Sequence, residues 1–482
     1  MMKKNILYII SICFCLNACS DFLEIEPGQQ ISITEQLSTK EGVLLSLNGI
    51  YRDIEALLSS RLMIYADVQG GNISFTPSTV SYFLEVPSVI ENSYDFTDQE
   101  DQSDYQGFYA DFYDIINQAN VLLININEFR FFTTLELNQL QAELLTIRAF
   151  AHYQIANYYA QNYNYTEDAS HLGIVYNTKP IISGVDFPSR LSINDTYERI
   201  KTDLESALNN YSDTQSLFGP NYSYFNKTTT EALYARIALQ MNDWQQAFTL
   251  SNNVITFSGI SLTSKENYVS DWELDEVPVS EIILEFSAPR TSEGDVSSSI
   301  SEHYSYNSTI NYSDYVASQD LLTLYEANDI RLDMFLEVNL TTLVNNIEIE
   351  APYYFTKKFQ GNAGTSFIRL SEMYLIRAEA NARLNKPDDA LLDLNVIRER
   401  SNLTILNTTA SILDDIFLER RRELAFEGHL LFDIARFKKD IIRDLGCLGT
   451  VCNLSYPSNY YVLPIPSSST DLNENIIQNE GY

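Results

Sequence analysis

Three glutamates on one predicted helix have a spacing that acid–base chemistry could use. Glu419, Glu423 and Glu427 recur every four residues, which places them on one helical face. Paired carboxylates can hydrolyse glycosidic bonds when one of them keeps its proton near neutral pH. Three arginines at 420–422 stand among these glutamates, however, and nearby cations hold carboxylates ionised. We therefore interpret the glutamates as part of a structural ion-pair lattice. Its expected further members are Arg398, Arg400, Asp433 and Arg436.

The other chemistry-bearing residues form no catalytic or metal-binding pattern. His429 is interpreted as a packed histidine, while His152, His171 and His303 are scattered along the chain. The sequence contains no G-x-S-x-G elbow, H-E-x-x-H pair, phosphate-binding loop or G-x-G-x-x-G turn. It also lacks the C-x-x-C pair typical of structural zinc sites. We expect no enzyme, no metal site and no cofactor; a surface glycosidase is the enzymatic alternative.

The N-terminus has the pattern of an export signal. Lys3 and Lys4 precede an apolar run at 5–16 that is too short to span a bilayer. The run ends in Leu-Asn-Ala-Cys at 16–19, which resembles the lipobox of bacterial lipoproteins. This predicts a signal peptide at 1–18, a lipid on Cys19 and a flexible tether at 19–30. The alternative is an ordinary secretory signal in which Cys19 is incidental.

Two cysteines remain in the body of the chain after the signal and the anchor are set aside. Cys447 and Cys452 are five positions apart. In an exported protein such a pair can close a small disulfide loop.

The composition of the chain, above all its negative charge, restricts the molecules that it can bind. The 482 residues carry a formal net charge of −34, and such a surface repels nucleic acids and anionic lipid headgroups. We interpret the acidity as a means of solubility and not as a metal-binding feature. The length suits one large domain, which we place at 31–482, with an N-terminal part at 31–230 and a C-terminal part at 231–482.

Helical periodicity dominates the elements that must position these residues. Within 137–160, apolar residues such as Leu140, Leu144 and Ile147 recur at spacings of three and four. Comparable stripes run through about 40–58, 105–128, 194–209, 228–240, 244–257, 369–384, 387–400 and 410–437. The Ser-, Asn- and Tyr-rich stretches at 66–104, 211–226 and 258–318 lack such stripes and are predicted to be loops with short strands or turns.

Two helical segments resemble one another. Residues 235–255 and 378–398 align without gaps, so that Asn242 meets Asn385 and Ala247 meets Ala390. Each reads as a helix, a turn and a second helix entered by small residues, which is the tetratricopeptide style of helical hairpin. Because the copies are far apart in the sequence, we expect several hairpins interrupted by long insertions.

The C-terminal third resembles the SusD/RagB family of the Bacteroidetes. The resemblance lies in the blocks 369–380 (RLSEMYLIRAEA), 395–400 (NVIRER), 419–429 (ERRRELAFEGH), 463–466 (LPIP) and 478–482 (QNEGY). Upstream, 143–159, 190–208 and 242–247 also fit. Leu430 departs from the family, which often has arginine there. The resemblance implies a mainly α, SusD-like fold of tetratricopeptide-like hairpins with long irregular insertions and minor β structure.

The resemblance also implies a function. SusD-like proteins are lipid-anchored on the extracellular side of the outer membrane and act as lids on a SusC-like TonB-dependent transporter. They bind an oligosaccharide, or in some members a peptide, and deliver it to the barrel without a nucleotide. A RagB-like peptide lid and a protein-binding scaffold without a small ligand are the alternatives that remain open.

Sugar recognition requires flat aromatic faces against C–H patches, together with polar groups for the hydroxyls. We expect these faces in the aromatic-rich insertions. The predicted ligand-binding residues are Tyr82, Phe83, Tyr222, Tyr224, Trp272, Tyr304, Tyr306 and Tyr312.

Overall fold

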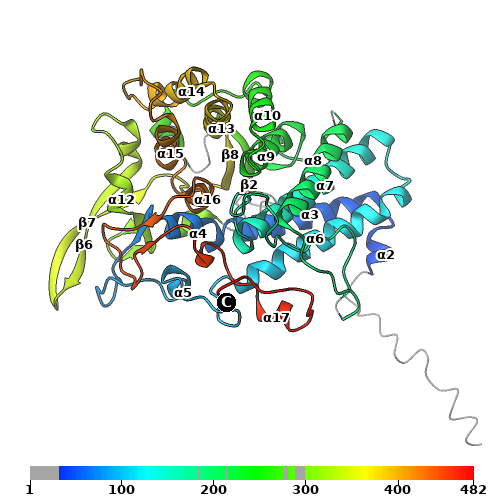
Figure 1. Ribbon diagram of the computed structural model, residues 1–482, viewed down its shortest axis with the longest axis horizontal. Helices are drawn as coiled ribbons and strands as arrows, with labels where there is room; N and C mark the ends of the chain where they lie inside the picture. The colour runs from blue at the N-terminus through cyan, green and yellow to red at the C-terminus, as the bar shows by residue number, and fades with distance from the viewer. Residues whose placement is uncertain (1–31, 183, 213, 275–279, 288–298) are drawn as a thin grey trace, which may run out of the picture.

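The computed structural model describes residues 32–182, 184–212, 214–274, 280–287 and 299–482, and most of their regular structure is helical (Figure 1). The longer helices are α3 (Lys40–Leu58), α4 (Arg61–Gly70), α6 (Gln106–Asn125), α7 (Thr134–Tyr159), α8 (Ile193–Asn210), α9 (Lys227–Gln240), α10 (Trp244–Phe257), α13 (Leu370–Arg383), α14 (Pro387–Arg400), α15 (Ile412–Glu423) and α16 (Leu430–Arg436). Short helices are α2 (Ile33–Gln36), α5 (Glu91–Tyr94), α11 (Tyr268–Trp272), α12 (Gln319–Leu322) and α17 (Ser467–Thr470). The prediction of a mainly α fold is confirmed.

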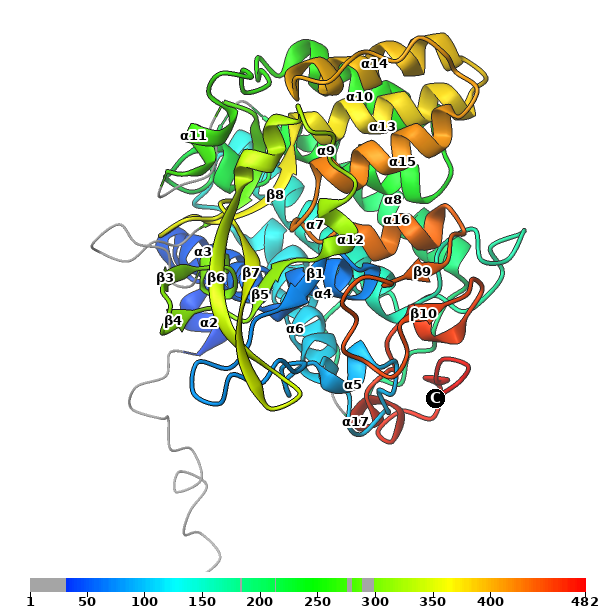
Figure 2. The ribbon, with the colours of Figure 1, turned by 90° about the vertical axis from the view of Figure 1, so that its left-hand side faces the viewer.

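The two sequence-related segments form helical hairpins that pack on each other. The first consists of α9 and α10, the second of α13 and α14, and α10 lies against α13 (Figure 2). Asn242 and Asn385, which the alignment matches, turn the chain with φ of 59° and 61°. Asparagine tolerates this left-handed conformation better than most residues. The same turn chemistry therefore closes both hairpins.

Helix α7 is the central element of the N-terminal half. Thr133 and Glu136 form a reciprocal capping box that starts it. From Gln139 to Tyr159 almost every side chain is buried, with α6 and α8 packed against it. This helix therefore has apolar neighbours all round and no solvent face over most of its length.

The stripe predicted at 410–437 is not one helix. α15 ends at Glu423, and α16 begins only at Leu430. Between them Phe426 and Gly428 take φ of 70° and 74°, which breaks the helix. The prediction that Glu427 shares a helix with Glu419 and Glu423 is therefore wrong.

Within the described residues, the strands pair two by two, and each pair is antiparallel. The pairs are β1 (Ile73–Phe75) with β5 (Tyr315–Ala317), β2 (Ile282–Phe286) with β8 (Thr365–Arg369), β3 (Tyr306–Ser308) with β4 (Asn311–Tyr312), β6 (Phe335–Val344) with β7 (Ile347–Thr356), and β9 (Ile441–Ile442) with β10 (Asn453–Leu454). Asn345 and Asn346, both at positive φ, form the tight turn of the long β6–β7 hairpin.

The N- and C-terminal parts of the body interlock. β1 of the first part pairs with β5 of the second, and the Thr365 hydroxyl donates to the carbonyl of Leu58. One continuous hydrophobic core includes residues from both parts. Cys447 and Cys452 form a disulfide. The predicted signal peptide and tether, with Cys19, lie outside the described residues.

Candidate ligand-binding surfaces

The segments that carry four of the predicted ligand residues meet beside the β6–β7 hairpin. Tyr82 and Phe83 come from the loop after β1, Tyr306 from β3 and Tyr312 from β4. Tyr353 of β7, which the sequence did not single out, lies beside them. We call these five residues the tyrosine-rich face. They come from segments more than 200 positions apart in the sequence, so only the fold can bring them together.

The hairpin supports this face from below. Side chains alternate along β7, so Ile347, Ile349, Tyr353 and Phe355 lie on one side of the strand. The Phe355 ring is buried, with its centroid 5.1 Å from the ring of Tyr306 and 6.1 Å from that of Tyr312. Phe355 therefore fixes the orientation of two tyrosines whose other sides are partly open.

Hydrogen bonds hold the Tyr82 loop against the hairpin. The Leu343 amide donates to the carbonyl of Tyr82 at 2.9 Å, and the Tyr312 hydroxyl donates to the carbonyl of Pro77 at the same distance. Tyr82 itself has φ of 57°, an uncommon conformation for an aromatic residue. These contacts place the loop that carries Tyr82 and Phe83 beside β4 and the end of β6.

The tyrosine-rich face is partly open to solvent, with Phe83 exposed and its four tyrosines half-buried. Phe83 is 51% exposed, and the aliphatic Ile310 and Ile347 nearby are 79% and 64% exposed. Burial raises the pKa of Tyr312 and Tyr353, so both phenols stay protonated. The Tyr312 hydroxyl donates its proton to Pro77, which leaves its oxygen available as an acceptor. Such a surface can stack against the apolar face of a sugar or an apolar peptide side chain.

Two predicted ligand residues are core residues instead. Trp272 and Tyr304 are 0% and 1% exposed, and both pack on the ring of Phe359. The sequence could not separate them from surface aromatics, because the insertion that carries them has no periodic pattern. We correct their assignment to structural residues.

Tyr222 and Tyr224 belong to a second, separate concavity, which we call the α9 cavity. Its volume is about 490 Å³. The residues around it are Gln139, Ser212, Thr214, Gln215, Asn221, Tyr222, those at 224–229, Ser258, Ile260, Ile282 and Ile283. Tyr224 is mostly buried, its ring edge-on to that of Tyr51 at 5.0 Å, whereas Tyr222 is half-buried. No residue lines both this cavity and the tyrosine-rich face.

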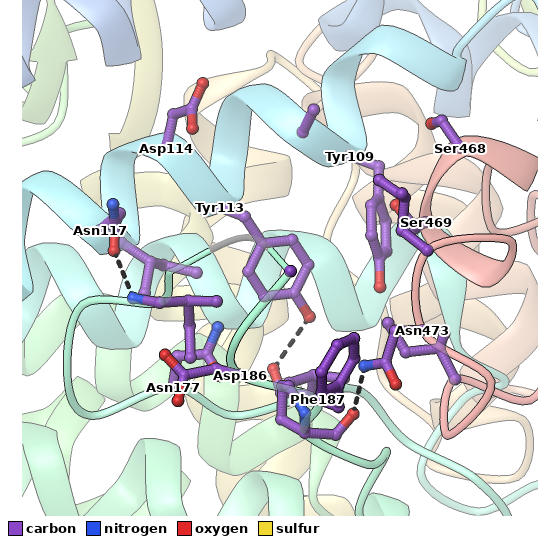
Figure 3. A pocket seen from close by; sticks show the side chains of 18 residues that line it. Tyr109, Tyr113, Asp114, Asn117, Asn177, Asp186, Phe187, Ser468, Ser469 and Asn473 are labelled. Carbon is purple, nitrogen blue, oxygen red and sulfur yellow. Dashed lines mark hydrogen bonds between the residues drawn. The ribbon is translucent and has the colours of Figure 1, made fainter. Parts of the chain in front are cut away.

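A third concavity of about 290 Å³ lies between α6, the segment 175–188 and the C-terminal turn that contains α17 (Figure 3). Figure 3 shows Tyr109, Tyr113 and Phe187 around it. The Tyr113 hydroxyl donates to the carbonyl of Val175 at 2.9 Å, and the Asn473 amide donates to that of Pro188 at 2.8 Å. These hydrogen bonds build the wall, so the cavity offers mainly aromatic and aliphatic surface. The sequence missed it because Tyr109 and Tyr113, four positions apart, belong to the core stripe of α6.

The glutamates flagged in the sequence are buried in an ion-pair lattice. Arg331 contacts Glu419 at 2.7 Å and Glu423 at 3.1 Å, and Arg369 contacts Glu427 at 2.8 Å. Burial by itself raises the pKa of Glu423, but the arginines around it outweigh burial and hold that pKa well below its usual range. A general acid requires the opposite shift, so this site is structural.

The membership of the lattice differs from the prediction. Arg398 and Arg400 join it as expected, through Glu419 and Glu423. Arg331, Lys358 and Glu281 are further members that come from distant segments, so helical spacing could not reveal them. Asp433 and Arg436 form a neighbouring network with Arg420 and Glu379.

The residues that the structure describes contain neither a metal-binding cluster nor a membrane-spanning helix. Among these residues, no three His, Cys, Asp or Glu side chains gather in a way that could hold a metal ion. In the same part of the chain, no helix has both the length and the apolar character needed to cross a membrane.

The stacked helical hairpins and the inserted strands can be compared with those of known proteins. A family model described as the SusD family matches residues 338–482, and a second, described as starch-binding and associating with the outer membrane, matches residues 21–239. The chain belongs to the SusD family.

Two individual proteins are similar to this chain over nearly its whole length, and a third is similar to part of it. Two SusD-like proteins of Formosa agariphila are 21% and 22% identical, the first over 91% of this chain and 93% of its own length, the second over 100% of both. The starch-binding protein SusD of Bacteroides thetaiotaomicron is 38% identical over 121 residues, which are 24% of this chain and 21% of that protein.

Solved structures show the same fold. A SusD superfamily protein of Bacteroides thetaiotaomicron matches with a TM-score of 0.79 and 24% identity, over 92% of this chain and 99% of that one. A SusD-like carbohydrate binding protein of Bacteroides vulgatus matches with a TM-score of 0.73 and 20% identity, over 91% and 97%.

Proposed function

We propose that this protein is a surface lipoprotein that captures oligosaccharides on its tyrosine-rich face and delivers them to a SusC-like TonB-dependent transporter. The observation that carries the proposal is that the loop with Tyr82 and the exposed Phe83 lies against the strands that carry the half-buried Tyr306 and Tyr312. Aromatic rings supply the stacking surface, and phenol oxygens supply acceptors for sugar hydroxyls.

The family context supports a carbohydrate ligand. The N-terminal family model is described as starch-binding, and one structural neighbour is described as a carbohydrate binding protein. We propose that the chain acts without catalysis. The ionised, arginine-bound glutamates of the lattice support this view, because they cannot serve as a general acid.

The anchor completes the proposed arrangement. Cleavage after Ala18 would leave a lipid on Cys19, and the tether at 19–30 would let the single domain at 31–482 stand above the outer membrane on its extracellular side. The SusC-like partner follows from the family resemblance.

The test is affinity electrophoresis of the mature chain from Ser20 in gels that contain amylopectin, laminarin, inulin, xylan, polygalacturonate or carrageenan. We expect retardation in at least one gel and loss of that retardation in Phe83→Ala, because the ring provides an exposed stacking face. Phe257→Ala is the matched control, since Phe257 is 79% exposed at the end of α10, a helix that Figures 1 and 2 show apart from β6 and β7. Equal retardation of Phe83→Ala and wild type would refute the assignment of the face.

A peptide ligand is the second candidate. Ile310, Val344, Ile347 and Ile349 surround the tyrosines with exposed aliphatic surface, which suits apolar side chains as well as sugar rings. If no polysaccharide retards the protein, calorimetric titration with a tryptic digest of casein distinguishes a peptide lid from a scaffold that binds only other proteins.

A further inference from the structure

The α9 cavity is a concavity of a size that suits one or two sugar rings. Its volume of about 490 Å³ lies within the range of small-molecule sites. Tyr222 and Tyr224 border it on one side, and Ile260, Ile282 and Ile283 supply apolar surface on another. Aromatic and aliphatic walls of this kind accept the C–H faces of a sugar ring.

Polar groups that have no partner in the protein also line the cavity. The side chains of Asn221, Lys227 and Thr228 make no hydrogen bond or ion pair with any residue in the described part of the chain, yet all three border the cavity. Asn226, by contrast, uses its side chain to cap α9. An amide, an ammonium and a hydroxyl are therefore available to a ligand without breaking a contact of the fold.

The charge of the lining is unlike that of the molecule as a whole. The sequence has 65 acidic and 31 basic residues, but Lys227 is the one charged side chain among the described residues that line the cavity. Glu231 lies one turn further along α9, outside the lining; burial raises its pKa, and the charge of Lys227 acts in the opposite direction. Behind the wall, Gln139 and Ser216 donate to the carboxyl of Glu143, and burial raises its pKa to about 7. The cavity therefore offers a positive charge with little opposing negative charge on its walls.

We propose that the α9 cavity is a second saccharide subsite, and that it holds a sugar residue carrying a carboxylate or a sulfate. The aromatic and aliphatic walls bind the ring, Asn221 and Thr228 bind hydroxyls, and Lys227 binds the anionic group. This inference rests on the proposed carbohydrate-capture function and adds a substrate class to it. Figure 1 places α9 well away from β6 and β7, so the subsite can engage a second part of a long polysaccharide.

The test is isothermal titration calorimetry of the mature chain with three probes. These are trigalacturonic acid, a sulfated carrageenan tetrasaccharide and neutral maltotriose. We expect one of the two acidic probes to bind, which identifies carboxylate or sulfate, and to lose about tenfold in affinity in Lys227→Gln. A charge-assisted hydrogen bond is of that order. Binding should also weaken as sodium chloride rises from 20 to 300 mM.

Controls separate the two proposals. Lys265→Gln removes an exposed lysine outside the cavity and should leave the affinity unchanged, while Tyr222→Ala should weaken it. Phe83→Ala should leave acidic-probe binding to the cavity intact. If no acidic probe binds, or if one binds equally to Lys227→Gln and wild type, the subsite is overturned. If retardation in the polysaccharide gels is lost in Phe83→Ala but unchanged in Lys227→Gln, the proposed function stands and the α9 subsite does not.

Discussion

At the scale of single residues, burial decides what each chemical group can do. Tyr312 and Tyr304 are both tyrosines of the same insertion, yet one borders an open face and the other is enclosed in the core. Buried carboxyls differ in the same way. Arginine side chains contact Glu423 and keep it ionised, whereas Glu143 has only hydroxyl, amide and phenol donors as partners. Glu143 is therefore a residue whose charge opposes folding, and burial has the same effect on Asp67 and Asp98.

Glu143 yields a prediction about pH. Burial raises its folded-state pKa to about 7, above the ordinary value of 4.5, so folding disfavours the charged form. Wild-type stability should therefore fall as pH rises from about 4.5 to about 7, relative to a variant that cannot ionise. We expect Glu143→Gln to match wild type below pH 4.5 and to exceed it by about 3 kcal/mol above pH 7.5, at about 1.4 kcal/mol per unit of pKa. Urea unfolding across this range measures the difference; a difference independent of pH would contradict it.

At the scale of elements, the chain uses local signals for its helices and long-range pairing for its insertions. The ends of α3 and α8 lie within a residue or so of the predicted stripes, since Thr39 and Ser192 cap them. The β6–β7 hairpin lies outside every predicted element, and its position depends on packing of Phe355 beneath two tyrosines. The elements that carry the candidate site are thus the ones with the weakest local pattern.

The turn between α13 and α14 provides a prediction at this scale. Asn385 is exposed, has φ of 61° and makes no side-chain hydrogen bond within the described residues. Asn385→Ala should lower the free energy of unfolding by about 1 kcal/mol, because alanine tolerates the left-handed region poorly, and Asn385→Gly should not. Thermal and urea unfolding test this. Asn209→Ala, at an exposed position inside α8, is the control and should be neutral or slightly stabilising. An equal loss of unfolding free energy in both alanine variants would show that backbone conformation at Asn385 is not the cause.

At the scale of the whole molecule, the two halves are held as one body. The β1–β5 pairing joins them, and the Gly428 amide donates to the buried carboxylate of Asp67. The C-terminal segment returns to the N-terminal half, where the Leu463 amide donates to the carbonyl of Tyr158. The tyrosine-rich face and the α9 cavity therefore sit on one rigid support, which suits simultaneous contact with a long ligand.

The prediction at this scale concerns the lipid anchor at Cys19. In a bacterium that exports the full chain, radiolabelled palmitate should be incorporated into wild type and not into Cys19→Ala, and the variant should leave the outer-membrane fraction. Cys447→Ala is the control for general loss of a cysteine, because that residue lies in the body. Labelling of Cys19→Ala at the wild-type level would show that the lipid is attached elsewhere.

The sequence by itself determined most of the long helices, the paired hairpins, the family and the structural nature of the glutamates near 419–427, but not α4 or the break between α15 and α16. These follow from periodicity, turn residues and charge, which act between positions close in the chain. Only the tertiary structure decided that Glu427 lies beyond its helix, that Trp272 and Tyr304 are core residues, and that Tyr82 meets Tyr312. The physical reason is that an aromatic side chain has the same local signature in a core and on a binding face. Its surroundings come from segments hundreds of residues away, and only folding brings those segments together.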